Sequence, residues 1–357
     1  LNESKTMKQL TKLPLLLLLI SLVSCATVES KYSLYRENGK YGLINEKREI
    51  VLSAEYDEIQ ENEVYLCKSE EKGNYVYSET LEVLHKFEDG QHSIIMCSPS
   101  LFYFKTGEKW YIENFFYSLP DNATTMTSLK AINGNKSNEL WVAGRTAFFK
   151  PDLTEFVDNW HCTYPYRENR AVVMNYDFVG EIIDEKFSLI LGEIKAKADY
   201  YSEGLIPVVM NSGESRYVDV NGNVVYECDF DFDYVQRGQY NSVQVPLVIG
   251  SFVEDVAVVK AKENQWFILD RDFNKHFLPE GYEVESYSYS NGLLLVSKTE
   301  NKEKKYGFVD KNCNIVIPCD FSYAESFDGK YAIVEKDEKD AVIDKRGNIF
   351  YSEDLKW

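Results

Sequence analysis

The sequence predicts an all-β repeat protein, and three observations support this fold class. A motif recurs about every 35 to 50 residues along the chain of 357 residues. Each copy contains short aromatic or β-branched runs that are separated by turn residues, and no convincing helical pattern is present. A second element recurs with the first one. A chain built from copies of one unit is an array rather than a set of unrelated domains.

The first repeated element is a strand that ends in a polar residue and is followed by a turn. This polar residue is an aspartate in five copies and an asparagine or a serine in two early copies: Asp184, Asp219, Asp270, Asp310, Asp344, Asn45 and Ser78. Asp or Asn at the start of a turn accepts backbone N–H bonds, and a following Gly or Asn supplies a left-handed residue. We therefore interpret each of these residues as the corner of a β-hairpin.

The second repeated element is an aromatic residue, a short polar turn and a β-branched run. Four copies are clear and a fifth is weaker; they occupy residues 201–209, 252–259, 289–296, 327–334 and, for the weak copy, 166–173. Such a pattern predicts a tight corner that leads into a buried strand. Each unit thus contains three or four short strands.

The clearest copy resembles the WG-containing β-repeat family. It runs Lys305-Tyr306-Gly307-Phe308-Val309-Asp310 and continues with Ile317-Pro318 and Phe321, and a second good copy covers residues 40–57. Tyr replaces the signature Trp in both copies, and Cys313 stands where a turn Gly is usual. The resemblance is good over residues 164–350, fair over 38–87 and loose over 88–160. It implies a β-rich repeat scaffold and no catalytic residue.

The predicted architecture is a β-propeller-like closed toroid of about seven short units, and the alternative is an open twisted β-solenoid. The first strand, at residues 32–35, resembles the last strand of a unit, whereas residues 341–350 resemble the first two strands. A unit split in this way closes a ring and removes exposed strand edges. Residues 32–357 are expected to form one array, with diverged units over 88–160; an insertion in that region is the alternative.

Residues 1–24 are predicted to be a lipoprotein signal peptide. Lys8 and Lys12 precede the apolar run at residues 13–20, which is too short to span a bilayer comfortably. Leu22-Val23-Ser24-Cys25 resembles the bacterial lipobox. Cleavage before Cys25 would leave a lipid attached to Cys25, with residues 25–31 as the anchor and linker. The alternative is an ordinary secretory signal.

Two further expectations concern this N-terminal segment. Met7 is the expected start of translation. Ala26 follows the cysteine, which favours the outer membrane in a Gram-negative host. The sequence therefore predicts a protein that is lipid-anchored in the bacterial cell envelope, and the membrane face stays open.

The composition limits the classes of partner. The formal net charge is −19 and the pI is about 4.8, which argues against nucleic acid and against anionic lipid surfaces. The chain contains 26 tyrosines. Repeated strand positions explain most of them, and an exposed aromatic face for glycan or peptide binding is the alternative.

No cofactor site, metal site or catalytic residue is predicted. Six cysteines remain besides Cys25, no Cys-x-x-Cys motif exists, and a Cys313–Cys319 disulfide stays open: Cys67, Cys97, Cys162, Cys228, Cys313 and Cys319. The acidic run at residues 229–233 lacks the Gly and the bidentate acid that a calcium loop of the helix-loop-helix type needs. The four histidines, among them His276 and His161 beside Cys162, fall in no ligand spacing.

The functional expectation is a non-enzymatic, membrane-anchored β-repeat scaffold that binds a protein or peptide at the cell envelope. Equivalent loops of successive repeats form a wide surface that suits macromolecular recognition. The alternative is a glycan-binding surface lipoprotein that uses Trp110, Trp141 or Trp160, which lie outside the repeat consensus. Trp266 occupies the signature position, so we interpret it as structural.

Overall fold

Antiparallel β-sheets make up nearly all of the described structure. The computed structural model describes residues 31–61, 64–96, 101–107, 109–114, 127–132, 139–140, 142–149, 156–157, 162–163, 167–175, 177, 179–197, 201–229, 249–261 and 265–356. The helical element described in this part of the chain is a short 3₁₀ turn, η2 (Ser352–Asp354). No helix among the described residues is long and apolar enough to cross a membrane.

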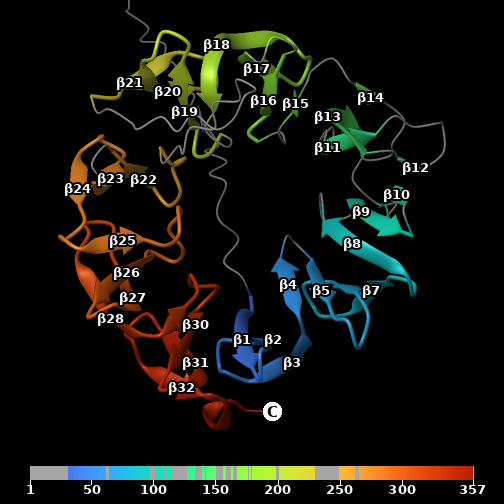
Figure 1. Ribbon diagram of the computed structural model, residues 1–357, viewed down its shortest axis with the longest axis vertical. Helices are drawn as coiled ribbons and strands as arrows, with labels where there is room; N and C mark the ends of the chain where they lie inside the picture. Colours follow the sequence, from blue (N-terminus) through green and yellow to red (C-terminus); the bar gives the residue numbers. More distant parts are fainter. Residues whose placement is uncertain are drawn as a thin grey trace, which may run out of the picture.

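The first four sheets contain strands β1 to β14 (Figure 1). The sheets are ordered β1-β2-β3, β4-β5-β6-β7, β12-β10-β9-β8 and β11-β13-β14. Their bounds are β1 Ser33–Glu37, β2 Lys40–Ile44, β3 Ile50–Tyr56, β4 Glu58–Glu61, β5 Tyr65–Lys68, β6 Tyr75–Tyr77, β7 Val83–Lys86, β8 Gln91–Met96, β9 Leu101–Thr106, β10 Lys109–Asn114, β11 Thr127–Ile132, β12 Glu139–Leu140, β13 Val142–Phe149 and β14 Phe156–Val157.

The remaining four sheets follow the chain order without a crossover. One sheet has seven strands, β15 to β21, and the others are β22-β23-β24, β25-β26-β27-β28 and β29-β30-β31-β32. Their bounds are β15 Cys162–Thr163, β16 Arg170–Met174, β17 Gly180–Asp184, β18 Leu189–Lys197, β19 Leu205–Met210, β20 Ser215–Asp219, β21 Val224–Glu227, β22 Val256–Lys260, β23 Trp266–Asp270, β24 Lys275–Phe277, β25 Tyr282–Val284, β26 Leu294–Glu300, β27 Glu303–Val309, β28 Ile315–Phe321, β29 Tyr323–Ala324, β30 Tyr331–Lys336, β31 Lys339–Asp344 and β32 Ile349–Tyr351.

The all-β prediction is therefore confirmed, and the number of sheets can be compared with the expected count of about seven units. The described strands form eight sheets, and the seven-stranded sheet contains the strands of two repeats. Figure 1 shows the sheets following one another around a centre, with β1, β22 and β30 toward the inside and β24 and β32 toward the outside.

The repeated polar residues form the hairpin corners that the sequence predicts. In each of the seven copies, a side-chain oxygen accepts hydrogen bonds from the backbone N–H groups two and four residues later, over 2.8–3.2 Å. The residue three positions later is always left-handed, with φ between 61° and 80°: Arg48, Leu81, Phe187, Gly222, Phe273, Cys313 and Gly347. Cys313 thus occupies the turn-glycine position.

Bulky residues tolerate this left-handed position because their side chains are held in place. A left-handed conformation costs an L-residue about 1–2 kcal/mol. The Phe273 ring stacks on Tyr226 at a centroid distance of 4.3 Å, and the Arg48 guanidinium lies 3.9 Å from the centroid of the Phe350 ring. Packing therefore offsets the backbone cost in these copies.

The glycine of the Tyr-Gly motif is required by close approach of two strands. A Cβ atom on Gly307 would lie 2.5 Å from the Ile317 carbonyl oxygen and 2.8 Å from the Cys319 nitrogen. Gly42 has the same surroundings, because its Cβ would lie 2.4 Å from the Leu52 carbonyl oxygen. Both glycines sit where the strand register shifts, in β2 against β3 and in β27 against β28. These bulges leave no room for a side chain.

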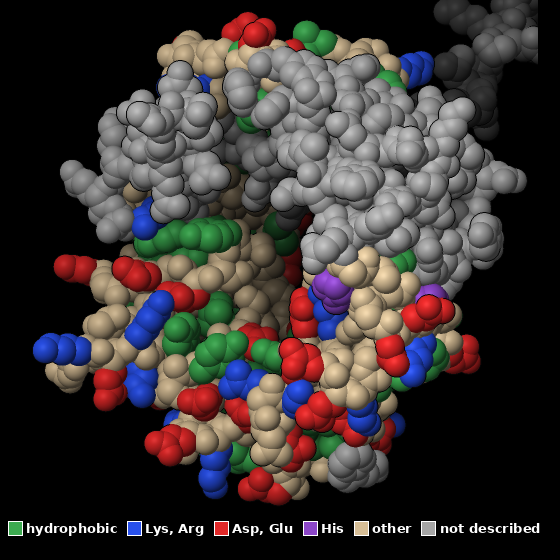
Figure 2. Space-filling view, turned by 45° about the vertical axis from the view of Figure 1, so that its right-hand side comes forward, with side chains coloured by type: hydrophobic (Ala, Val, Ile, Leu, Met, Phe, Trp, Pro, Cys, Tyr) green, Lys and Arg blue, Asp and Glu red, His purple; other side chains and the backbone are tan. Residues whose placement is uncertain are grey.

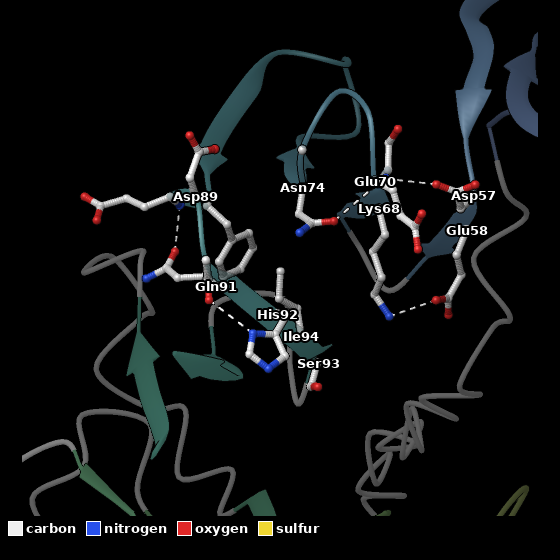
Figure 3. Close-up of a pocket in the computed structure, with 15 residues that line it drawn as sticks. Asp57, Glu58, Lys68, Glu70, Asn74, Asp89, Gln91, His92, Ser93 and Ile94 are labelled. Atoms are coloured by element: carbon white, nitrogen blue, oxygen red, sulfur yellow. Dashed lines mark hydrogen bonds and ion pairs between the residues drawn. The ribbon is translucent and has the colours of Figure 1, made fainter. Parts of the chain in front are cut away.

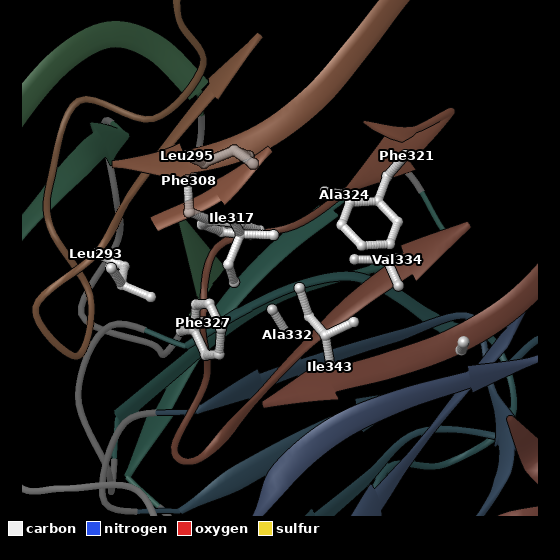
Figure 4. Packing of buried hydrophobic residues seen from close by; sticks show 11 residues of the cluster. Leu293, Leu295, Phe308, Ile317, Phe321, Ala324, Phe327, Ala332, Val334 and Ile343 are labelled. Atoms are coloured by element: carbon white, nitrogen blue, oxygen red, sulfur yellow. The ribbon is translucent and has the colours of Figure 1, made fainter. Parts of the chain in front are cut away.

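The apolar cores lie between successive sheets. One cluster joins Leu295, Phe308 and Phe321 of the β25–β28 sheet to Val334 and Ile343 of the last sheet (Figure 4). Other clusters similarly join β19 and β20 to β22 and β23, and β22 and β23 to the β25–β28 sheet. The β22–β24 and β25–β28 sheets thus contribute side chains to a core on both of their faces.

The last sheet packs against the first one. Tyr35 and Ile44 share an apolar cluster with Tyr331, Ile333 and Val342. The expected split unit, however, is wrong, because β1 pairs with β2 and the last sheet is completed by its own strands. A short hairpin connection closes at a lower entropic cost than a pairing between distant segments. The two ends of the array therefore meet by packing rather than by sharing a sheet.

We expect Gly307→Ala to lower the free energy of unfolding by about 3 kcal/mol or more, because a backbone shift is needed to admit the methyl group. Gly39→Ala is the matched control: Gly39 has φ of +76°, and its added Cβ would meet no atom within 4 Å. The control should cost about 1 kcal/mol. Urea denaturation of the three proteins measures both values, and equal losses would contradict the close-approach explanation.

Replacement of Asp310 by Ala should cost about 1–2 kcal/mol of stability, because two backbone N–H groups lose their acceptor, as in the loss of a helix cap. Asp310→Asn keeps an acceptor oxygen and should change stability by less than about 0.5 kcal/mol. Asn45 already performs this role in the first sheet. The midpoint of thermal unfolding distinguishes the two variants, and a loss of similar size in both would point to charge rather than geometry.

Candidate functional site

One end of the sheets carries a row of interlocked turns. Four of the described turns with two consecutive left-handed residues belong to this row: Glu168 and Asn169, Glu203 and Gly204, Glu254 and Asp255, and Asn291 and Gly292. These backbone angles are typical of type I′ turns, which match the twist of the adjoining strands. The turns fall in the second repeated element, at the polar residues that the sequence analysis describes as tight corners.

Glutamate side chains connect each of these turns to the next. The Glu168 carboxylate accepts a hydrogen bond from the Gly204 N–H at 2.8 Å. In the same way, the Glu203 carboxylate accepts one from the Asp255 N–H at 3.0 Å. The Glu254 carboxylate accepts one from the Gly292 N–H at 2.6 Å. Hydrogen bonds with a charged acceptor are stronger than those between neutral groups. We call these three contacts the glutamate ladder. They hold neighbouring loops in register on one face.

Polar contacts also fix the first sheet to the last one. The Asp328 carboxylate accepts from the Leu34 N–H at 3.0 Å, and the Ser33 hydroxyl accepts from the Lys330 N–H at 3.0 Å. Arg36 donates to Asp340 at 2.6 Å, and its guanidinium lies 4.5 Å from the centroid of the Tyr323 ring. We call this set the closing contacts.

Asp328 is the most strongly perturbed carboxyl group of the closing contacts. Burial and the neighbouring charge of Glu61 raise its pKa to about 7, the Leu34 N–H opposes this shift, and Glu325 adds to it. In the turns the direction is opposite. Partial burial alone would raise the pKa of Asp270, but hydrogen bonds from Asn274, His276 and backbone N–H groups lower it to about 2.

A pocket of about 530 Å³ lies at the second sheet, between the β5–β6 hairpin and the turn that leads into β8 (Figure 3). Phe87, Ile94 and Ser69 are its buried lining residues. Pockets of 300–1,000 Å³ are typical of ligand sites. The remaining lining residues are polar or charged, apart from two glycines: Asp57, Glu58, Lys68, Glu70, Gly73, Asn74, Glu88, Asp89, Gly90, Gln91, His92 and Ser93.

The pocket is acidic, and part of its charge is not paired within the described part of the chain. Lys68 is paired with Glu58 at 3.0 Å. A hydrogen bond from Lys40 and one from the Glu70 N–H lower the pKa of Asp57. The carboxylates of Glu70, Glu88 and Asp89 form no ion pair with any described residue. These three groups give the rim of the pocket a negative potential.

Several residues of sequence interest lie outside the described side chains. Residues 1–30, which include the signal segment and Cys25, are outside the described residues, as are Trp141 and Trp160. Trp110 lies in β10, where only the backbone is described. Trp266 is buried in β23, which confirms its structural role.

Four cysteines with described side chains are free thiols, namely Cys67, Cys228, Cys313 and Cys319, so Cys313 and Cys319 form no disulfide. Burial raises the pKa of Cys313 to about 12, and its thiol donates to the His276 carbonyl oxygen at 3.0 Å. The His276 ring instead faces Asp270, with Nε2 and Oδ2 3.0 Å apart. A protonated thiol that does not contact the imidazole is not an activated nucleophile.

The acidic run after β21 is held by protein contacts where it is described. Asp229 accepts from the Tyr226 hydroxyl at 2.9 Å and pairs with Lys275 at 2.7 Å. Among the described residues, no group of three or more His, Cys, Asp or Glu side chains could hold a metal ion.

The pocket and the glutamate ladder were both missed at the sequence level. The ladder had a signal, because Glu168, Glu203 and Glu254 occupy the same place in three copies of the second element. The pocket had none, because its lining comes from two turns that only the folded sheets bring together.

Comparison with known proteins identifies the repeats. The family model of the WG containing repeat matches residues 41–63 and 306–339. This chain carries WG containing repeats. Both matches begin at the tyrosine that stands directly before Gly42 or Gly307, the two glycines that the strand bulges require. No curated protein sequence matches the chain.

The chain is also similar in fold to solved structures. It matches a crystal structure described as the eukaryotic initiation factor with a TM-score of 0.53 and 10% identity, over 90% of this chain and 95% of that chain. BamB from Moraxella catarrhalis matches with a TM-score of 0.39 and 11% identity, over 72% and 83% of the two chains. Kluyveromyces lactis Hsv2 matches with a TM-score of 0.30 and 8% identity, over 78% of this chain and 94% of that chain. The first of these likenesses concerns the fold alone.

The pH dependence of stability should reveal Asp328. Its pKa is about 7 in the folded protein, against about 3.9 for an unfolded aspartate, so ionisation opposes folding. The stability that protonated Asp328 contributes is fully present below about pH 4, and it is lost as the pH rises through 7. Asp328→Asn keeps an acceptor for the Leu34 N–H and cannot ionise.

We expect Asp328→Asn to be more stable than the parent at pH 8, with the difference shrinking toward pH 5. Thermal unfolding midpoints at several pH values measure this difference. Asp337→Asn, at an exposed hairpin tip, is the control and should run parallel to the parent. Parallel curves for Asp328→Asn as well would refute the assignment.

Proposed function

We propose that this protein is a non-enzymatic, membrane-anchored β-repeat scaffold that binds a protein or peptide at the bacterial cell envelope. The acidic pocket at the second sheet carries this proposal. Glu70, Glu88 and Asp89, which form no ion pair with a described residue, suit a basic segment of a partner, because complementary charge speeds association and selects partners. A pocket lined by two exposed turns is accessible to a macromolecule.

The scaffold of this proposal is a β-propeller-like closed toroid. The apolar cluster between the first and last sheets and the closing contacts support a ring over an open twisted solenoid. An open solenoid would leave Tyr35 and Tyr331 on two separate end faces. The glutamate ladder supports the same geometry, because it keeps neighbouring loops on one face.

The location in this proposal rests on the sequence. The lipobox-like segment that ends at Cys25 would anchor the protein through acyl chains, each buried methylene contributing about 0.8 kcal/mol. Ala26 favours the outer membrane. Metabolic labelling with a radioactive or clickable fatty acid tests this, because Cys25→Ala should abolish the label.

Glycan binding is the alternative proposal. It rests on Trp110, Trp141 and Trp160, since exposed aromatic rings stack well on sugar faces. Binding on a glycan array, together with a change in tryptophan fluorescence, would favour this alternative. A silent array would leave protein or peptide binding.

Charge reversal at the pocket should weaken partner capture. We expect Glu88→Lys with Asp89→Lys to reduce the yield of crosslinked partner from whole cells about tenfold, which corresponds to about 1.4 kcal/mol. Asp272→Lys with Glu280→Lys makes the same charge change at exposed positions away from the pocket and serves as the control. Equal capture by both variants would remove the pocket from the proposal, and no captured partner at all would remove protein binding.

A further inference from the structure

The outer edge of the first sheet is covered by an extended segment of the chain itself. Ile50 donates its N–H to the Lys356 carbonyl oxygen at 2.6 Å, and Lys356 donates its N–H to the Arg48 carbonyl oxygen at 2.9 Å. These two bonds form a parallel bridge between Lys356 and Glu49. Figure 1 shows the C-terminal end beside the first and last sheets. The edge that follows this repeat turn therefore accepts one extended residue of another segment.

Strand β28 presents the same edge in the same register. Ile315 lies opposite Val309, as Ile50 lies opposite Ile44 in the first sheet. In this register the N–H of Ile50 points away from β2. Because Ile315 occupies the equivalent position, the N–H of Ile315 points away from β27. Cys313, like Arg48, is the left-handed residue of its turn. β28 is the last strand of its sheet, so its outer edge pairs with no described strand.

The apolar side chains of the two edges differ in exposure. Ile50 and Val51 are half-buried on the edge that the chain covers. In the last sheet Phe350, which the Arg48 guanidinium covers, is also half-buried. Ile315 and Val316 are 44% and 41% exposed. The open edge thus displays two aliphatic side chains together with an outward N–H and C=O pair, which is a template for strand addition.

Pro318 limits the length of this template. Proline has no N–H to donate, and Pro318 is exposed on the same strand. Pairing is therefore confined to residues 313–317, which matches the short two-bond contact made by Lys356 in the first sheet. An occupant needs only a few extended residues.

We propose that the outer edge of β28 at residues 313–317 is a docking site for an extended peptide segment of a partner protein, added as a parallel strand. A carbonyl oxygen of this peptide accepts a hydrogen bond from the Ile315 N–H, and one of its N–H groups donates a hydrogen bond to the Cys313 carbonyl oxygen. The peptide also covers the side chains of Ile315 and Val316. This inference rests on the proposed function, because it names a second contact for a protein or peptide partner. The pocket and this edge lie on different sheets and are separable.

Hydrogen–deuterium exchange with a peptide probe tests the edge. The probe is a synthetic peptide of residues 350–357, which contains the residue that pairs with the edge of the first sheet. Added in excess to the full protein, it should slow exchange of the Ile315 amide about tenfold. Unchanged exchange at residues 313–317 would overturn the proposal. Self-association through this edge without peptide would also overturn it, in favour of a second copy.

Two variants separate edge pairing from other effects. Ile315→Pro removes the outward N–H without removing a bond to β27, and it should abolish peptide protection. Ile315→Lys keeps the backbone N–H and replaces an exposed apolar side chain, so it should weaken the protection that the peptide gives. This variant replaces Ile315→Pro in the experiment if the proline variant does not fold. Val83→Pro on β7 is the matched control and should leave protection at residue 315 intact. The proline variant has no amide at position 315, so protection is compared at the other amides of residues 313–317, and equal protection there in Ile315→Pro and the parent would overturn the proposal.

Crosslinking in whole cells keeps this inference distinct from the proposed function. A partner captured by the parent and by Val83→Pro, but lost from Ile315→Pro and Ile315→Lys, supports the edge. A partner captured equally by all four overturns the edge and leaves the proposed function standing. Capture by none of them overturns the proposed function, and the peptide experiment then decides the edge by itself.

Discussion

Face-to-face packing between successive sheets is the constraint on which the rest of this structure depends. A sheet of three or four short strands is too small to bury a core alone. Here most of the described cores belong to two sheets, as in the cluster that joins Phe308 and Phe321 to Val334 and Ile343, and one further cluster lies within the seven-stranded sheet. The same kind of cluster joins the last sheet to the first through Tyr331 and Tyr35. Strands with both faces buried explain the continuous β-branched runs in the sequence.

This packing explains how the acidic residues of the chain are used. The net charge of −19 is partly carried by carboxylates that accept backbone hydrogen bonds. Asp310 and its equivalents close hairpins, Glu203 and Glu254 join neighbouring turns, and Asp328 joins the first and last sheets. The carboxylates named here therefore have a structural role, whereas other acidic side chains are spread over the described surface (Figure 2). The carboxylates of Glu70, Glu88 and Asp89 stand apart because they have no such partner among the described residues.

Local features were predictable from the sequence, and long-range ones were not. The hairpin corners, the left-handed place of Cys313 and the burial of Trp266 all follow from a few neighbouring residues. The split unit was wrong, because a repeat pattern does not say which strand begins a sheet. Here β1 begins its own sheet, whereas the pattern placed it at the end of a unit.

The residues of the candidate site could not be predicted from the sequence, because they come together through long-range contacts. The pocket joins two turns of the second and third sheets, and its volume depends on how those sheets pack. No local pattern marks Glu88 or Asp89 as pocket residues. The edge of β28 could be located only after the pairing of Lys356 with Ile50 was known. Sequence reasoning identified the scaffold, and the placement of exposed groups required tertiary structure.

The closing contacts have a consequence for the order of folding. Leu34 and Asp328 are 294 residues apart, and Arg36 and Asp340 are 304 apart, whereas the hairpins and the glutamate ladder join much closer residues. Local sheets can form as soon as their strands are available, but the junction of the first and last sheets must wait for nearly the whole chain. In a chain that becomes available from its N-terminus onward, the first sheet therefore has to stay without its last neighbour until nearly all other sheets have formed.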